Sequence, residues 1–306
     1  MIKGMKKFIL TLIAAALMPV LAMAQCPTPT TATATVTLKR VIPGLLDGKF
    51  SVSETKKVAF SQGNLQYNSD EQKWQLATNQ WDYIGATTGN TSITVDGKAN
   101  NTGIADLFGW VGASSIWTGL KGHGLTSSTA TEATDGYGNV SGESLKSDWG
   151  TLIGSGWRTL TIEEWRYLFN TDNRPERRQG NRYARANIHG VNGMILLPDG
   201  WTQDASAMSG TLSGINGAGF VYSIVDNDDW AILEKEGCVF LPAAGWRDSG
   251  ITMKNVGTEG RYWPSSITPM IPRDADYITF TQYNVSTSSS YYRYYGCSVR
   301  LVQDVK

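Results

Sequence analysis

Two apolar segments near the end of the chain constrain its fold more than any other feature of the sequence. Residues 237–242 (GCVFLP) and 297–302 (CSVRLV) each predict a buried strand. Between them lie residues 260–266 (GRYWPSS), an alternating segment and a Ser/Tyr-rich segment, 286–295, which we expect to be a loop. Two strands that hold a polar, aromatic loop between them are more typical of a binding protein than of an enzyme.

Residues 275–285 alternate, with Tyr277 and Tyr283 on the same face, and therefore predict a strand. A helix is predicted to start after Thr161, because Thr161 and Glu164 form a capping box. Trp165 and the apolar residues one turn further along share one face of that helix.

The acidic run 226–229 predicts the start of a second helix, with Trp230 and Leu233 facing inward and Gly237 as its stop. Each of the two helices leads to a buried strand that ends at Pro and a Gly-Trp turn. We therefore expect two similar helix–strand packings in one core. The 11 tryptophans and 33 glycines of the chain predict many loops that are pinned by aromatic anchors.

The first 24 residues predict a secretory signal peptide, because lysines precede the apolar run 8–22 and residues 22–24 (AMA) fit the small-residue cleavage rule. The run is short and contains Pro19, which argues against a membrane anchor. Gln25 before Cys26 argues against lipoprotein processing. We expect export to the periplasm, the outer surface or the medium.

Residues 25–38, rich in Thr, Pro and Ala, predict an extended linker, and residues 39–306 predict a single domain. Without the signal peptide the chain has 24 basic and 27 acidic residues, because three lysines and no acidic residue are removed. This balance argues against nucleic acid or an anionic membrane as a partner. No transmembrane segment is expected after cleavage.

Catalytic, cofactor and metal motifs are missing from the sequence. His123 and His189 lie in expected loops without a second ligand at metal spacing. The run 226–229 lacks the glycine and terminal glutamate of a calcium loop, so helix capping explains it better. The one basic cluster predicts a solvated loop rather than a site for an acidic ligand; it consists of Arg174, Arg177, Arg178, Arg182 and Arg185.

Three cysteines remain after cleavage: Cys26, Cys238 and Cys297. Export permits disulfides, and an odd count leaves at least one thiol unpaired within the chain. Cys238 and Cys297 both lie in apolar, strand-like segments. The sequence is equally consistent with a bridge between them and with two buried free thiols.

The candidate binding surface is the Ser/Tyr-rich segment with its aromatic neighbours, since Tyr offers rigid contact area, Ser adapts and Arg anchors. The alternative is a solvated polar loop whose aromatic side chains enter the core. The candidate residues are Arg261, Tyr262, Trp263, Tyr283, Asn284, Ser286, Ser288, Tyr291, Tyr292, Arg293, Tyr294 and Tyr295.

Several motifs carry a family resemblance that spans about residues 57–302. Residues 157–165 (WRTLTIEEW) resemble a segment of formylglycine-generating-enzyme-like and C-type-lectin-like proteins. Residues 260–266 and 296–302 are similar to motifs of the Fibrobacter succinogenes major paralogous domain and its secreted relatives in gut Bacteroidales. Residues 58–67 resemble the opening of those relatives.

The resemblance implies an α+β, C-type-lectin-like fold with a small twisted, mainly antiparallel sheet, two short helices and long loops. Some members of the family are variable proteins of diversity-generating retroelements, in which the last segment before the terminal strand is diversified for ligand binding. Residues 283–295 would occupy that place here.

Three departures from the family patterns matter. Formylglycine-generating enzymes bind copper through a close pair of cysteines, whereas Cys238 and Cys297 are far apart in the sequence. The calcium-dependent sugar motifs of C-type lectins are missing, and residues 197–199 (LPD) are only a partial match. Pro264 replaces the usual Ser after Tyr-Trp.

We therefore expect a secreted or cell-surface, non-enzymatic protein, without a cofactor, that binds an extracellular protein or glycan. The alternatives are a divergent enzyme of the formylglycine-generating type and a structural surface protein without a specific ligand.

Overall fold

The computed structural model describes residues 42–91, 103–110, 148–170, 182–201, 223–248, 252–266, 268, 271 and 274–306. All of them belong to one compact unit, Val41–Lys306. The expected signal peptide and linker lie outside the described residues. So do Cys26, His123 and the arginines at 174, 177 and 178.

Short strands are the main regular secondary structure of the described residues. They are β1 (Phe50–Ser51), β2 (Lys57–Phe60), β3 (Leu65–Asn68), β4 (Lys73–Leu76), β5 (Ile104–Ala105), β6 (Trp157–Thr159), β7 (Tyr183–Ile188), β8 (Val191–Leu196), β9 (Ser223–Val225), β10 (Val239–Pro242), β11 (Trp246–Arg247), β12 (Met253–Lys254), β13 (Glu259–Tyr262), β14 (Asp274–Thr281), β15 (Val285–Tyr292) and β16 (Leu301–Val305). The helices are α1 (Thr88–Thr91), the 3-10 turn η2 (Trp149–Leu152), α3 (Ile162–Phe169) and α4 (Asn227–Lys235).

The described strands form five small sheets, in the orders β1-β2-β16-β6, β10-β8-β7-β9, β13-β14-β15, β4-β3-β5 and β11-β12. Among these strand pairings only that of β7 with β9 is parallel. The expected α+β class, with mainly antiparallel sheets and few short helices, is confirmed.

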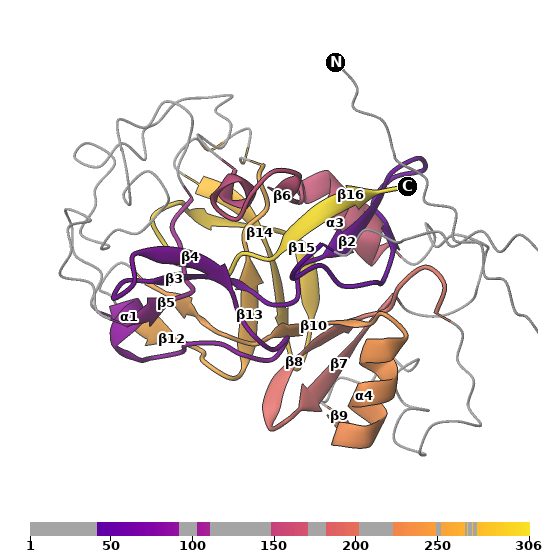
Figure 1. The fold of residues 1–306 in the computed structure, drawn as a ribbon. Coiled ribbons are helices and arrows are strands. Elements are labelled where there is room, and N and C mark those ends of the chain that lie inside the picture. Colours follow the sequence, from indigo (N-terminus) through magenta and orange to yellow (C-terminus); the bar gives the residue numbers. More distant parts are fainter. Residues whose placement is uncertain are drawn as a thin grey trace, which may run out of the picture. The chain divides into compact units, whose positions relative to one another are not determined.

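The last strand lies in the middle of its sheet, paired with β2 on one side and β6 on the other (Figure 1). Leu301 and Val302 are fully buried there. The strand begins later than the predicted 297–302, because its pairing with β6 starts only at Leu301. Cys297 and Ser298 instead form isolated bridges to other segments.

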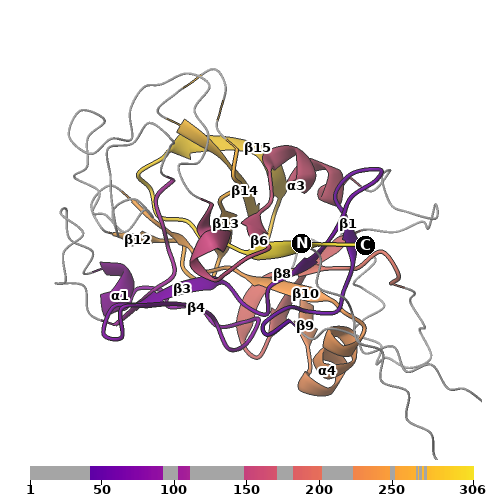
Figure 2. The ribbon, with the colours of Figure 1, turned by 45° about the horizontal axis from the view of Figure 1, so that its top comes forward.

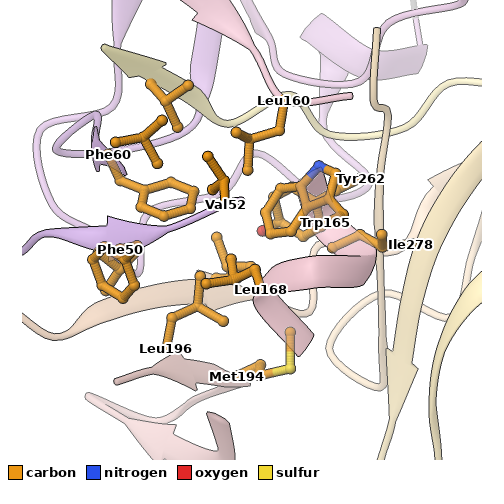
Figure 3. Close-up of a cluster of buried hydrophobic side chains, with 14 of the residues drawn as sticks. Phe50, Val52, Phe60, Leu160, Trp165, Leu168, Met194, Leu196, Tyr262 and Ile278 are labelled. Carbon is orange, nitrogen blue, oxygen red and sulfur yellow. The ribbon is translucent and has the colours of Figure 1, made fainter. Parts of the chain in front are cut away.

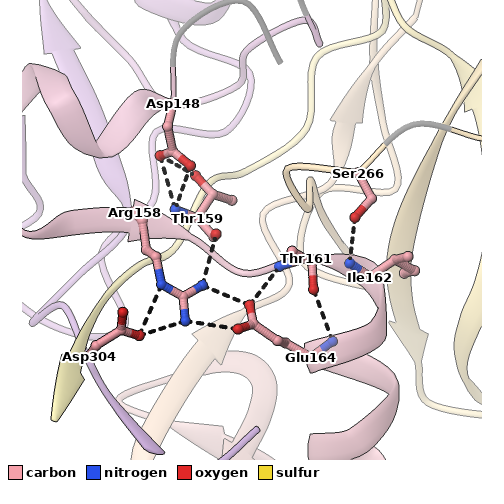
Figure 4. Close-up of polar contacts among 8 residues, drawn as sticks. All are labelled: Asp148, Arg158, Thr159, Thr161, Ile162, Glu164, Ser266 and Asp304. Atoms are coloured by element: carbon pink, nitrogen blue, oxygen red, sulfur yellow. Dashed lines mark hydrogen bonds and ion pairs between the residues drawn. The ribbon is translucent and has the colours of Figure 1, made fainter. Parts of the chain in front are cut away.

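The predicted capping box at the start of α3 is present. The Thr161 side chain accepts a hydrogen bond from the backbone N–H of Glu164, and the Glu164 carboxylate accepts one from the N–H of Thr161. The next N–H, that of Ile162, donates to the Ser266 hydroxyl at 2.9 Å (Figure 4). Two of the segments that carry the family resemblance therefore meet at this helix end.

Arg158 joins this helix start to the C-terminal strand. Its guanidinium contacts both carboxylate oxygens of Glu164, at 2.7 and 2.9 Å, and Asp304 at 2.7 Å (Figure 4). The bidentate contact with Glu164 fixes the orientation of the Arg158 and Glu164 side chains. The Trp-Arg…Glu-Trp spacing of residues 157–165 thus has a structural role in the fold.

The apolar face of α3 packs into the largest core cluster, which Figure 3 shows. The Trp165 ring lies 5.9 Å from that of Phe60 on β2, and Leu168 is buried beside it. Met194 and Leu196 of β8 close the cluster from the other side. Figure 2 shows α3 lying beside β14 and β15, which it contacts.

Helix α4 also begins and ends as predicted. The Asp226 carboxylate accepts a hydrogen bond from the N–H of Asp229, and Trp230 and Leu233 are buried. Gly237 follows with φ of +87°, and a Cβ there would lie 2.6 Å from the backbone of Gly48, so only glycine fits. The buried strands that follow the two helices, β8 and β10, pair with each other.

The Ser/Tyr-rich segment is not the loop that we expected. The strand predicted over residues 275–285 ends at Thr281, and after a short turn the chain returns as β15, paired antiparallel with β14. A serine run has no apolar alternation to indicate a strand, so here the neighbouring strand decides the conformation. The polar sequence of residues 86–105 also predicts a loop, but its described residues include α1 and β5.

Candidate ligand-binding surface

A tight turn at the end of β15 gathers four tyrosines. The N–H of Tyr295 donates to the carbonyl of Tyr292 at 3.0 Å, so the chain reverses over residues 292–295. The rings of Tyr291, Tyr292, Tyr294 and Tyr295 thereby come into contact. We call these four residues the tyrosine cluster.

Within the cluster the rings form two stacked pairs. Tyr291 stacks on Tyr295 with centroids 4.8 Å apart, and Tyr292 stacks on Tyr294 at 5.1 Å. The two pairs meet edge to face, as Tyr294 does against Tyr295 at 5.1 Å. Rings this close fill the space between them, so the cluster offers its outer surface to a ligand and no internal cage.

A continuous stack supports the cluster from beneath. Tyr295 stacks on Trp246 with centroids 5.0 Å apart, and the Arg261 guanidinium lies 4.0 Å from the centre of the Trp246 ring. Arg261 also lies 4.9 Å from the centre of the Tyr277 ring. Tyr291 is therefore the outer end of a stack that runs back to β14. We call its five members the aromatic stack: Tyr291, Tyr295, Trp246, Arg261 and Tyr277.

Glu259 fixes Arg261 within the aromatic stack. The Arg261 Nε donates to the Glu259 carboxylate at 2.6 Å, and Asn255 and Thr279 donate to the same carboxylate. Burial alone would raise the pKa of Glu259, but the hydrogen bonds from Arg261 and Asn255 outweigh it and lower the pKa. The carboxylate is thus charged at neutral pH and holds the guanidinium in place.

Exposure divides the candidate residues into two groups. Tyr291 is 42% exposed and Tyr292 and Tyr294 are half-buried, whereas Tyr295 is buried at 8%. Burial, followed by the neighbouring Tyr291, raises the pKa of Tyr295. The interpretation of Tyr295 as a ligand-contacting residue is therefore corrected: it supports Tyr291 from below.

Three further candidates are buried and are also corrected. The Tyr262 hydroxyl donates to the carbonyl of Pro242 at 2.9 Å, and burial raises its pKa. The indole N–H of Trp263 donates to the carbonyl of Phe108 at 2.6 Å. The Arg293 guanidinium is fully buried, 5.4 Å from the centre of a tryptophan ring. These side chains belong to the core because each polar group is bonded or stacked inside it.

The remaining candidates lie along or beyond β15. Tyr283, 70% exposed, and Asn284 occupy the β14–β15 turn, at the other end of the strand from the tyrosine cluster. Eight strand residues span about 25 Å, so the two ends are separate surfaces. Ser288 is exposed and Ser286 half-buried between them. The exposed candidate residues therefore form two separate surfaces, not the single surface expected from the sequence.

Sequence reasoning did not assign Trp246 and Tyr277 to this surface. Trp246 follows a glycine in a turn, and Tyr277 lies in the alternating strand. No sequence spacing connects either residue with Tyr295, because the contact depends on how distant strands pair. The one available signal was the alternation of residues 275–285, which places Tyr277 on the same face of its strand as Ala275 and thereby indicates a side chain that packs inward.

Arg300, in the terminal Ser-Val-Arg motif, is structural. Its guanidinium is fully buried and donates to the carbonyls of Ser61 at 2.9 Å and Phe240 at 2.6 Å and to the side chain of Asn64 at 3.0 Å. A fourth bond, of 3.3 Å, reaches the carbonyl of Gln80. The residue joins four separate segments of the chain.

Cys238 and Cys297 are buried free thiols, which decides between the two alternatives left by the sequence. Burial raises the pKa of Cys297 to about 12 and also raises that of Cys238. Neither group therefore forms the thiolate that reacts with disulfides or binds soft metals.

The other ionisable candidates also have structural roles. His189 stacks on Trp81 with ring centroids 3.9 Å apart, in the turn between β7 and β8. Arg182, expected in a solvated loop, is buried and paired with Asp199 at 2.9 Å. No group of three or more His, Cys, Asp or Glu among the described residues could hold a metal ion.

Of the helices that the structure describes, none is long and apolar enough to span a membrane. Comparison with family models, curated proteins and solved structures finds no match to this chain.

Proposed function

We propose that this chain is an exported, non-enzymatic binding protein whose ligand contacts the outer surface of the tyrosine cluster. The observation that carries the proposal is the exposed ring of Tyr291 at the end of the aromatic stack. A large aromatic side chain held rigid at the surface loses little conformational entropy on binding. Such side chains are the usual anchors of binding surfaces.

Export is supported by the residues that precede the described unit. Lysines, an apolar run and a small-residue cleavage site follow one another over residues 1–24. The resemblance to C-type-lectin-like secreted proteins of gut Bacteroidales supports the same assignment. Under this proposal the C-terminal part of residues 283–295, which carries the tyrosine cluster, would hold the place of the diversified segment of retroelement variable proteins.

The formylglycine-generating type of enzyme has less support. That chemistry needs two neighbouring cysteines that are available as thiolates, and the pKa values of Cys238 and Cys297 are both raised by burial. Both side chains are packed in separate core clusters. We therefore propose no catalytic role for them.

The proposal is tested by screening the mature chain on arrays of extracellular proteins and of glycans. A double variant, Tyr291→Ser with Tyr294→Ser, alters the cluster surface and leaves the buried Tyr295 in place. Tyr283→Ser is the matched control, because it removes an exposed tyrosine from the far end of β15. Loss of binding in the double variant alone supports the proposal, and unchanged binding contradicts it.

A further inference from the structure

The tyrosine cluster holds two phenol rings in contact across a tight turn. The rings of Tyr291 and Tyr295 have centroids 4.8 Å apart and planes 28° from parallel. Burial raises the pKa of Tyr295, and a hydrogen bond with the Tyr291 side chain raises it further, because Tyr295 is then the donor. The two hydroxyl groups therefore lie side by side, and so do the ring carbons ortho to them.

Tyr291 is the member of this pair that a dissolved oxidant can reach. Its side chain is 42% exposed, whereas Tyr295 is buried at 8%. Removal of one electron and the phenolic proton from Tyr291 leaves a neutral phenoxyl radical. The hydrogen bond between the two hydroxyl groups then allows a hydrogen atom to pass from Tyr295 to Tyr291, which moves the radical inward. A second oxidation at Tyr291 leaves two radicals in ring contact.

The residues beneath the pair oppose the spread of oxidation into the core. Trp246 stacks on Tyr295 at 5.0 Å and is itself an oxidisable ring. Its buried indole N–H has no hydrogen-bond partner within the described ranges, so no neighbouring group takes up the proton that oxidation would release. The Arg261 guanidinium, 4.0 Å from the ring centre, adds to this by disfavouring a radical cation on Trp246, although its partner Glu259 offsets part of the charge.

Contact within one chain favours this pair over the other tyrosines. Groups that are held in contact react as if at very high concentration, whereas exposed tyrosines of separate chains must first meet. Tyr283 is the more exposed ring, at 70%, but it lies at the other end of β15, roughly 25 Å away. Tyr292 and Tyr294 stack at 5.1 Å but are half-buried, so Tyr291 meets the oxidant first.

We propose that Tyr291 and Tyr295 form an oxidative cross-linking site, at which two one-electron oxidations join the two rings as an intrachain dityrosine. A carbon–carbon bond forms between the ortho carbons of the two phenoxyl radicals. The hydrogens on those carbons move to the oxygen atoms, which restores both phenols. The net loss is two electrons and two protons, and one molecule of hydrogen peroxide accepts them and becomes two molecules of water. The bond would tie the end of β15 to the segment that follows the turn.

The test treats the dilute mature chain with a peroxidase and hydrogen peroxide. The expected product is a monomer that has lost two hydrogen atoms and shows dityrosine fluorescence. Trypsin cuts after Arg293, so the cross-link appears as two joined peptides whose fragmentation identifies the two tyrosines. Tyr291→Phe and Tyr295→Phe each keep a ring in the stack but form no phenoxyl radical, and the monomer fluorescence should fall about tenfold or more in each. Tyr283→Phe is the matched control, with unchanged fluorescence.

Joined peptides that link Tyr291 to Tyr295 in the monomer, with loss of the signal in both Phe variants of this pair, support the inference. Cross-links between copies alone, a cross-link placed on Tyr292 and Tyr294, or oxidation of Trp246 in place of a cross-link overturns it. Peptide mapping of the unaltered chain needs no variant, so it decides the outcome even where a variant fails to fold. The inference does not depend on the proposed function, because ligand binding and cross-linking are separate measurements.

Discussion

The Arg261 guanidinium lies 4.0 Å from the centre of the Trp246 ring. Two consequences follow from this contact. The guanidinium separates Trp246 from Tyr277, so neither ring is free to shift toward the other. Trp246 in turn carries Tyr295 and, through it, Tyr291. The position of the exposed ring is therefore set by a charged residue that does not itself need to touch a ligand.

Replacing Arg261 should weaken both the fold and the cluster. In Arg261→Ala the buried Glu259 loses its charged partner, and we expect a loss of roughly 2 kcal/mol in the free energy of unfolding. Arg261→Lys keeps the charge but not the flat stacking surface, so an intermediate loss is expected. Urea unfolding measures both. A change below about 0.5 kcal/mol in Arg261→Ala would contradict this role.

Replacing Arg300 should cost more stability than replacing an arginine at the surface. Burial lowers the pKa of Arg300 to about 10, which still leaves it charged at neutral pH. Lysine at this position cannot reach all four acceptors, so buried carbonyls would lose their donors. We expect Arg300→Lys to lose about 3 kcal/mol or more in urea unfolding. Arg166 has a partly exposed side chain, and Arg166→Lys should lose less than about 1 kcal/mol. Equal losses of stability in the two variants would argue against the assigned role of Arg300.

Local sequence signals predicted the two longer helices, α3 and α4, but neither α1 nor η2. The Thr161–Glu164 capping box and the Asp226 cap depend on residues within one helical turn, and Gly237 marks its own left-handed turn. Signals of this kind act over a few residues, so they do not depend on how the rest of the chain folds. The mainly antiparallel α+β class, in contrast, was an implication of the family resemblance, and the sheets confirm it.

The binding surface was less predictable. Residues 286–290 contain four serines and one threonine, and nothing local indicates that β14 will pair with them. Nor does composition distinguish the exposed Tyr291 from Tyr295, four residues later and buried. The contact of Trp246 with Tyr295 depends on the pairing of distant segments, which a single sequence does not reveal.

The buried Asp106 should make the stability depend on pH. It accepts hydrogen bonds from the N–H of Ile84 and the Asn90 amide, but burial dominates and raises its pKa to about 6. The folded state therefore holds this proton more tightly than the unfolded chain, whose pKa is near 3.9. The stability contributed by Asp106 is present below pH 4 and is lost as the pH rises through 6.

The measurement is urea unfolding of the unaltered chain and of Asp106→Asn between pH 4 and pH 7. The free energy of unfolding of the unaltered chain, minus that of the variant, should fall by up to about 3 kcal/mol over this range. A difference that stays constant with pH would show that Asp106 is ionised with an ordinary pKa.

The two buried thiols should be unreactive until the chain unfolds. In a Cys26→Ser chain, Cys238 and Cys297 are the remaining cysteines, and both are buried. A thiol reagent such as DTNB should label neither in the native protein and both in urea, without prior reduction. Failure to label in urea would indicate a bridge between them. Rapid labelling in the native state would contradict their burial.

Hydroxyl-radical labelling tests the central claim most directly, because it reports the exposure of each tyrosine with and without ligand. In the mature chain alone, Tyr283 and Tyr291 should label readily and Tyr262 and Tyr295 weakly. With a saturating amount of a ligand retained on the arrays, the account predicts protection of Tyr291 and unchanged labelling of Tyr283. Unchanged labelling of Tyr291 in the bound state would contradict it.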